Sequence, residues 1–163
     1  MTVRSRDFEQ RRVEEDRLFF FELEFFDIGN ELIDGLNLIK TLESLSIGHS
    51  KLNTTNRLKK MLKKLTIKYT KLTNFEVFYD NDEIEELRLI DVGEVDLLNL
   101  IPFKKIKKLD IYDCNITNFR KIKEFSELKE LKLAGSNLDN DEVLNELEEN
   151  IKVQKYDSYL PMG

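Results

Sequence analysis

The chain has 163 residues, of which 40% are hydrophobic and 36% charged, and its formal net charge is −6. One cysteine excludes a disulfide framework and a thiolate zinc centre, and one histidine excludes His-rich metal sites. The length fits a single domain with a substantial core, and no apolar run approaches the length of a membrane span.

The first segment, residues 1–17, is charged and lacks the apolar stretch of a signal peptide. Together with the absence of cysteine pairs, this predicts an intracellular protein, cytoplasmic or nuclear. We expect 1–17 to form a polar N-terminal cap, 18–157 to form a domain of about seven repeats, and 158–163 to form a C-terminal tail. Tyr156, Tyr159 and Leu160 are expected to cover that end of the domain.

The middle of the chain repeats one apolar pattern, in which a central leucine is flanked by an apolar residue on each side. The pattern begins at Leu42, Leu62, Ile84, Ile106 and Leu128. Its central leucines are Leu45, Leu65, Leu87, Leu109 and Leu131. The first spacing is slightly shorter than the others, which are all 22 residues. Leu23 continues the series backwards, and Ile151 with Val153 is interpreted as a degenerate last copy.

Each repeat predicts a strand followed by a return segment. The alternation of apolar and polar residues around each central leucine is typical of a half-buried strand, and successive strands can pair in parallel. Apolar residues at helical spacing predict short helices at 58–62, 119–125 and 143–147, the last with Asp139 or Asn140 as N-cap. The third repeat departs from the pattern, because Glu94 fills an apolar slot and Val95 follows one residue later.

These residues resemble the leucine-rich repeat family, whose pattern is L-x-x-L-x-L-x-x-N/C-x-L. The 22-residue period and the run from Ile116 to Leu128 are similar to the short, phosphatase-regulator-like subclass. The resemblance implies an α/β solenoid, a curved horseshoe with a parallel β-sheet on its concave face and short helices or turns on its convex face. It also implies a noncatalytic module that docks a protein on the strand face.

The ladder position of the family pattern, usually Asn, holds other residues in this chain: Ser50, Thr70, Val92, Cys114 and Ser136. We expect the hydroxyl and thiol groups to donate hydrogen bonds to the turn. Val92 cannot donate, which predicts an irregular turn in the third repeat.

Side chains between the buried apolar positions should project from the strand face. One column consists of the residues that stand three positions after each central leucine. Its last two members are Ala134 and, in the degenerate copy, Gln154. From this column and its neighbours we predict partner-binding residues, namely Phe26, His49, Tyr69, Arg88, Ile90, Asp91 and Tyr112. Tyr and Arg are common binding hot spots, so Tyr69, Arg88 and Tyr112 are the strongest candidates for a shallow docking strip. The alternative is that these are ordinary isolated apolar side chains on a surface.

Lysines form two clusters at equivalent places two repeats apart. An acidic partner or RNA phosphate could be bound by Lys63, Lys64, Lys68, Lys107 and Lys108. The alternative function is therefore an accessory subunit of a ribonucleoprotein or other large assembly. Glu85 and Glu86 lie between the clusters and dilute their field, and Lys-rich runs are usually solvated faces.

Nothing in the sequence predicts catalysis. His49 has no serine or cysteine clearly placed beside it, and Cys114 fills a ladder position expected to be buried. The acidic run 80–83 lacks the glycine and the spacing of a calcium-binding EF-hand loop. We therefore expect no enzyme activity, no metal, no cofactor, no small-molecule substrate and no membrane partner.

Overall fold

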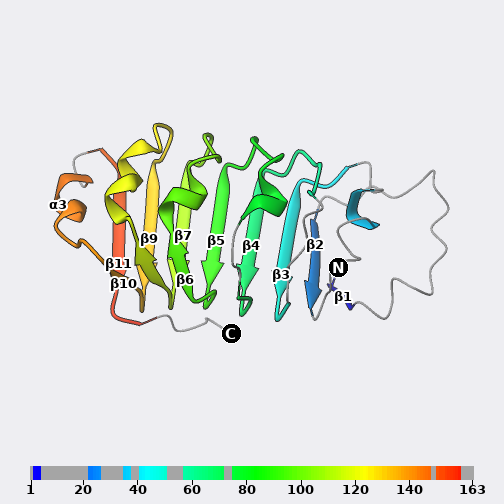
Figure 1. Cartoon of the computed structure of the whole chain (residues 1–163), viewed down its shortest axis with the longest axis horizontal. Coiled ribbons are helices and arrows are strands. Elements are labelled where there is room, and N and C mark those ends of the chain that lie inside the picture. Colours follow the sequence, from blue (N-terminus) through cyan, green and yellow to red (C-terminus); the bar gives the residue numbers. More distant parts are fainter. Residues whose placement is uncertain are drawn as a thin grey trace.

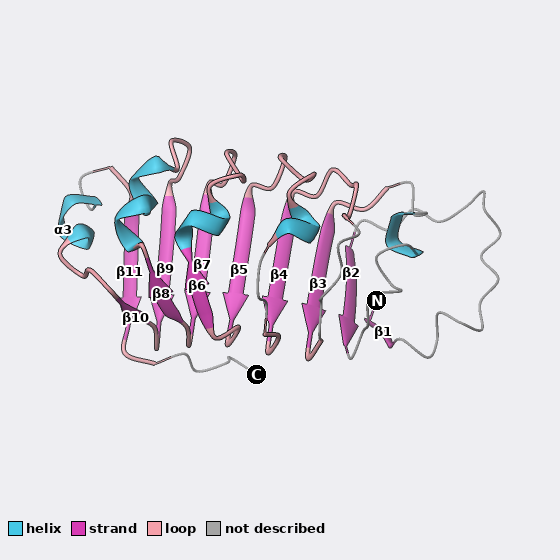
Figure 2. Ribbon diagram, viewed as in Figure 1, coloured by secondary structure: helices cyan, strands magenta, loops and turns pink. Residues whose placement is uncertain are grey.

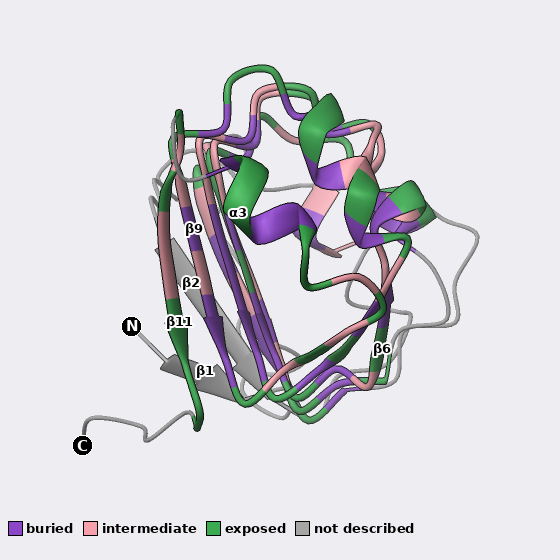
Figure 3. Ribbon diagram, turned by 90° about the vertical axis from the view of Figure 1, so that its left-hand side faces the viewer, coloured by how far each residue is buried: buried purple, intermediate pink, exposed green. Residues whose placement is uncertain are grey.

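A computed structural model of the chain describes residues 2–4, 22–26, 35–37, 41–50, 57–71, 75–147 and 150–158, with only the backbone for 2–4 and 22–26. The fold is α/β: a long parallel sheet forms one side, and short helices with a second, small sheet form the other (Figures 1 and 2). Figure 3 marks buried residues on both sides, in the strands of the long sheet and in the helices. We call the face of the long sheet that points away from the helices the outer face.

Eight parallel strands make the long sheet, and their spatial order is β1-β2-β3-β4-β5-β7-β9-β11. Their bounds are β1 (Thr2–Arg4), β2 (Glu22–Phe26), β3 (Ser44–Gly48), β4 (Lys64–Lys68), β5 (Glu86–Ile90), β7 (Lys108–Tyr112), β9 (Glu130–Ala134) and β11 (Lys152–Tyr156). The central leucines from Leu23 to Leu131 pair with one another strand by strand, as the repeat predicts. The sequence register is thus confirmed for these six strands.

The last copy of the repeat lies two residues later than predicted. Val153, rather than Ile151, pairs with Leu131, so the period of the preceding repeats continues unbroken. Ile151 precedes the strand and packs, partly buried, against the core. Tyr156 instead of Gln154 therefore aligns with Ala134, and Gln154 pairs with Lys132.

The second sheet has three short parallel strands in the order β10-β8-β6. They are β6 (Glu94–Asp96), β8 (Asn115–Thr117) and β10 (Asn137–Leu138). Val95 pairs with Ile116, because Gly93, at φ +88°, inserts one extra residue in the third repeat. Only a residue without a Cβ adopts such a conformation readily. The predicted irregularity of this turn is confirmed.

The return segments hold short helices, as predicted at 143–147 and, as a 3₁₀ helix one residue shorter, at 119–125. They are the 3₁₀ segments η1 (Glu76–Phe78), η2 (Leu97–Leu100) and η3 (Phe119–Glu124), and the α-helix α3 (Val143–Leu147). The helix predicted at 58–62 is wrong: this segment is irregular, so Leu58 and Leu62 are buried while Met61 is 72% exposed. The N-cap prediction for Asp139 is also wrong, because its carboxylate accepts the N–H groups of Asn118 and Phe119 at the start of η3.

The ladder side chains donate as expected. The hydroxyls of Ser50 and Thr70 donate to the carbonyls of Gly48 and Lys68, at 2.7 and 2.9 Å. The Cys114 thiol donates to the Tyr112 carbonyl at 3.1 Å, and the Ser136 hydroxyl donates to its own turn at 3.2 Å. Thr70 and Ser136 also accept the backbone N–H of the preceding ladder residue, Ser50 and Cys114. These bonds join successive repeats and satisfy buried backbone groups.

The ends of the domain are described in part. Thr2–Arg4 form β1, which pairs in parallel with β2; the rest of the predicted cap, 5–17, lies outside the described residues. Tyr156 does not cover the C-terminal end, since it lies in the edge strand β11 and is 53% exposed. Tyr159 and Leu160 lie outside the described residues. Among the helices that the structure describes, none has the length and apolar character needed to cross a bilayer.

Candidate functional site

A row of side chains follows the carboxyl ends of five neighbouring strands. We call it the rim row: His49 after β3, Tyr69 after β4, Asp91 after β5, Asp113 after β7 and Gly135 after β9. All five have left-handed backbones, with φ of 50°, 53°, 46°, 52° and 60°. Each N–H donates to the carbonyl of the last residue of the next strand, at 2.8 to 3.2 Å. The left-handed turn therefore extends the sheet hydrogen bonding by one residue in every repeat.

Aromatic side chains occupy one end of the rim row. The rings of His49 and Tyr69 are stacked, with centroids 4.8 Å apart and planes 18° apart. Tyr69 is 42% exposed, and His49 is also exposed. The structure thus brings together two residues predicted from separate repeats to contact a partner.

Carboxylates occupy the middle of the rim row. Asp91, a predicted site residue, and Asp113 are both exposed, and neither forms an ion pair within the described part of the chain. Asp113 lies over Gly135: a Cβ added to this glycine would stand 2.0 Å from Asp113 Oδ1. Asp113 is not among the partner-binding residues predicted from the sequence. The available signal was the recurrence of an acid one repeat after Asp91.

The docking strip predicted around Ile90 and Tyr112 is wrong in one respect, because neither residue is exposed. Their exposed fractions are 6% and 8%, and with Ala134 they form an apolar cluster separate from the main core. Register explains the cluster: Ile90, Tyr112 and Ala134 pair side by side at the ends of β5, β7 and β9. Phe26 occupies the matching position in β2, where only the backbone is described.

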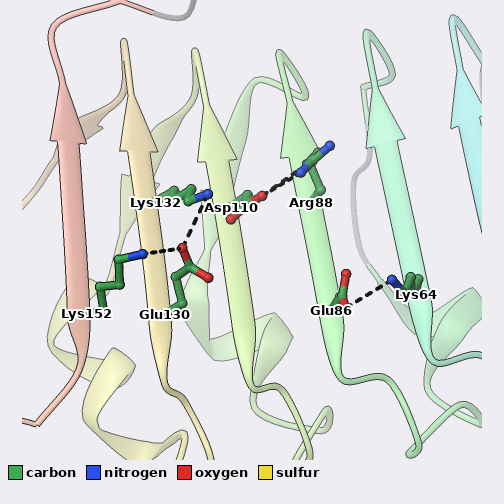
Figure 4. A network of polar contacts seen from close by, with 7 residues as sticks. All are labelled: Lys64, Glu86, Arg88, Asp110, Glu130, Lys132 and Lys152. Carbon is green, nitrogen blue, oxygen red and sulfur yellow. Dashed lines mark hydrogen bonds and ion pairs between the residues drawn. The ribbon is translucent and has the colours of Figure 1, made fainter.

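Arg88 already binds a neighbouring strand. Its Nε and Nη2 donate to Asp110 Oδ2 at 3.1 and 2.9 Å, as Figure 4 shows. The Asp110 side chain is only 2% exposed, and its Oδ1 has no hydrogen-bond partner among the described residues. Sequence reasoning missed Asp110, although it stands one repeat after Arg88 and pairs with it in register. The Arg88 side chain is 47% exposed.

Carboxylates of adjacent repeats form ion pairs with lysines of the predicted phosphate-binding site. Lys63 pairs with Glu43 at 3.4 Å, Lys64 with Glu86 at 3.1 Å, and Lys107 with Glu85 at 2.8 Å. The hydrogen bond between Lys107 and Glu85 lowers the pKa of Glu85 and raises the pKa of Lys107. Lysine and glutamate therefore alternate from strand to strand across this part of the sheet, which cancels much of the positive field.

The same alternation reaches the far edge of the sheet. Glu130 in β9 approaches Lys132 at 3.3 Å and Lys152 of β11 at 3.5 Å (Figure 4). Burial raises the pKa of Glu130, but the hydrogen bond from Lys132 and the charges of Lys132, Lys108 and Lys152 outweigh burial and lower it overall. We call the alternating column formed by Lys64, Glu86, Lys108, Glu130 and Lys152 the charge ladder. Lys68, the remaining predicted lysine, lies at the end of β4 beside Ile90.

The described residues hold no cluster of three or more His, Cys, Asp or Glu side chains arranged as metal ligands. Cys114 is buried, as predicted, and burial raises the pKa of its thiol. A raised pKa keeps the thiol protonated and unreactive at neutral pH. This cysteine therefore has the environment of a structural group rather than of a nucleophile.

Comparison with known proteins adds no relative to this description. No protein-family model matches the chain, and a search of the curated proteins finds no match.

Proposed function

We propose that the chain is a leucine-rich-repeat solenoid that serves as a noncatalytic docking module for a protein partner. The in-register parallel strands, one in each repeat, and the ladder hydrogen bonds support the solenoid. One unpaired, buried cysteine is compatible with an intracellular setting, which we propose as well.

The observation that carries the docking proposal is the stacked pair of His49 and Tyr69. Tyr69 keeps 42% of its surface exposed while its backbone holds a left-handed conformation. All five rim positions share this conformation, since it belongs to the turn of every repeat, and the hydrogen bond from its N–H to the Ile90 carbonyl holds the Tyr69 backbone in place. A rigid, exposed tyrosine is also a typical interface hot spot.

The alternative, an RNA-binding accessory subunit, has less support. Its affinity would depend on phosphate contacts from lysines. Three of the five predicted lysines, Lys63, Lys64 and Lys107, are engaged by glutamates of adjacent strands. Binding a phosphate there would require breaking those pairs, so the lysines favour a structural role.

Affinity purification of the tagged protein tests the proposal, with the lysate divided into nuclease-treated and untreated halves. We expect a protein to copurify from both halves with the wild type and to be lost with Tyr69→Ala. Loss of a hot spot that contributes about 2 kcal/mol weakens binding about 30-fold.

Met61→Ala is the matched control, since Met61 is an exposed apolar side chain outside the strands. Retention of the partner by Tyr69→Ala would contradict the proposal. Recovery of material that nuclease or added salt releases would favour the RNA alternative.

A further inference from the structure

We propose that the rim row recognises a basic, arginine-bearing segment of the partner, laid across the ends of β3, β4, β5 and β7. This inference rests on the proposed docking function and adds the chemistry of what docks. It depends on three features of the rim row: its order of side chains, its uncompensated charge and its spacing.

The order of side chains suits arginine. The stacked rings of His49 and Tyr69 offer an aromatic face, and the next two positions, Asp91 and Asp113, offer carboxylates. A guanidinium is the side chain that both stacks on aromatic rings and binds carboxylates through two parallel hydrogen bonds. A lysine ammonium matches the carboxylates as a point charge but makes the weaker stack.

The charge of the rim row is uncompensated, in contrast to the charge ladder at the opposite end of the same strands. Lys64 and Lys152 of the charge ladder pair with the glutamate of an adjacent strand. Asp91 and Asp113 have no such partner within the described residues. A partner cation would therefore meet available carboxylates here, without having to displace an internal lysine.

The spacing fixes the length of the recognised segment. Adjacent strands lie about 4.8 Å apart, so the four side chains from His49 to Asp113 span roughly 14 Å. An extended peptide rises about 3.3 Å per residue, so it covers this distance with about five residues. Two arginines separated by one residue lie about 6.6 Å apart in an extended chain, so one guanidinium would lie over Tyr69 and the other between Asp91 and Asp113, about 7 Å away.

Gly135 keeps the acidic end open. A side chain at this position would collide with the Asp113 carboxylate, whose Oδ1 would lie 2.0 Å from the new Cβ. The left-handed backbone of Gly135 also disfavours any residue with a Cβ. The glycine therefore lets the Asp113 carboxylate extend over the next strand, where an incoming cation can reach it.

The test is an NMR titration of the isotope-labelled protein with a synthetic peptide of about five residues that carries two arginines separated by one residue. We expect saturable shifts at the amides of the rim row. Replacing both arginines with lysine should weaken binding several-fold, since stacking and bidentate hydrogen bonding are lost.

The decisive variant is Asp91→Asn with Asp113→Asn, because asparagine tolerates the left-handed backbone and removes only the charge. We expect at least a tenfold loss of peptide affinity. The charge-matched control is Glu94→Gln with Glu142→Gln, which alters two exposed acids outside the long sheet and should leave affinity unchanged. Equal losses in both double variants, or shifts that centre away from the rim row, would overturn the inference.

The cellular partner separates this inference from the docking proposal. If the copurified protein is lost with Tyr69→Ala but kept by the double asparagine variant, docking stands and the basic segment is excluded. If the peptide binds the rim row while no copurified protein depends on Tyr69, the chemistry of the rim row stands and the docking proposal fails.

Discussion

The charge ladder and the rim row lie on the same sheet but treat charge in opposite ways. In the ladder, Lys64 and Lys152 each meet a glutamate on an adjacent strand. In the rim row, Asp91 and Asp113 stand side by side with no ion pair inside the described residues. Lysines that are clustered in the sequence are thus neutralised by the glutamates that the strand register places beside them. Asp91 and Asp113, which are one repeat apart in the sequence, are instead brought together. We propose accordingly that the charge ladder contributes to stability and that the rim row binds the partner.

The largest expected effect comes from placing a carboxylate on the buried face of the long sheet, compared with placing one on its outer face. Leu109→Asp places a carboxylate in the core, where Leu109 is fully buried, and should cost about 5 kcal/mol or more, enough to unfold the chain. Urea unfolding followed by circular dichroism measures the loss. Thr66→Asp is the outer-face control, because it places an acid opposite Arg88 and should change stability by less than about 1 kcal/mol. Similar losses in both variants would show that the assignment of faces is wrong.

The two tyrosines at the ends of β4 and β7 give the next largest contrast. Tyr112→Ala removes a ring that is 8% exposed and should cost about 3 kcal/mol. Tyr69→Ala removes an exposed ring and should cost no more than about 0.5 kcal/mol of stability while weakening partner binding about 30-fold. Unfolding midpoints in urea compare the two variants. A Tyr112→Ala variant as stable as the wild type would place that ring outside the buried cluster.

Reversing one rung of the charge ladder tests its contribution to stability. Glu86→Lys sets three lysines side by side, at positions 64, 86 and 108, and should cost about 1 kcal/mol. Adding Lys64→Glu restores one opposite-charge pair and should recover part of the loss. Glu94→Lys, on the second sheet, is the control. Salt should shrink the effect in the reversed ladder, because these charges are partly exposed; a salt-independent loss would point to a steric cause.

The smallest expected effect is on the dependence of stability on pH. Hydrogen bonding to Lys107 lowers the pKa of Glu85 in the folded chain below its ordinary value of 4.5. The contribution of Glu85 is therefore present above pH 4.5 and is lost as the pH falls through its folded pKa. The pKa of Lys107 is raised above 10.5, so its contribution is present below that pH and is lost as the pH rises further.

Urea unfolding at pH values from below 4.5 to above 10.5 checks the direction of both stability changes. Lys107→Gln should flatten both limbs of the stability profile, since it removes the pair. Lys104→Gln, which removes an exposed lysine outside the strands, should leave the profile unchanged. An unaltered acid limb in Lys107→Gln would show that this pair contributes nothing measurable.

The strands could be predicted because the leucine spacing repeats with little change. Leu23 to Leu131 pair as the period requires, and the missing donor at Val92 marks the irregular turn. The sequence pattern places the last strand two residues too early, because Ile151 and Val153 are both apolar. Only the pairing with Leu131 decides between them. The segment 58–62 shows the converse: its helical spacing is genuine, but the chain there is irregular.

The candidate site was less predictable, because it depends on what stands on neighbouring strands. His49, Tyr69 and Asp91 could be chosen from their column alone. The burial of Ile90 and Tyr112 could not, since it depends on what surrounds them in the fold, where they cluster with Ala134. The pairing of the lysines likewise depends on which carboxylate the register places opposite each one.

The most direct measurement is photo-crosslinking in living cells, with a photoreactive amino acid placed at position 69 or, for comparison, at position 61. We predict that position 69 captures one protein partner, that nuclease treatment leaves the crosslinked product intact, and that position 61 captures nothing comparable. Equal capture at both positions, or a product that nuclease digests, would contradict docking through the rim row.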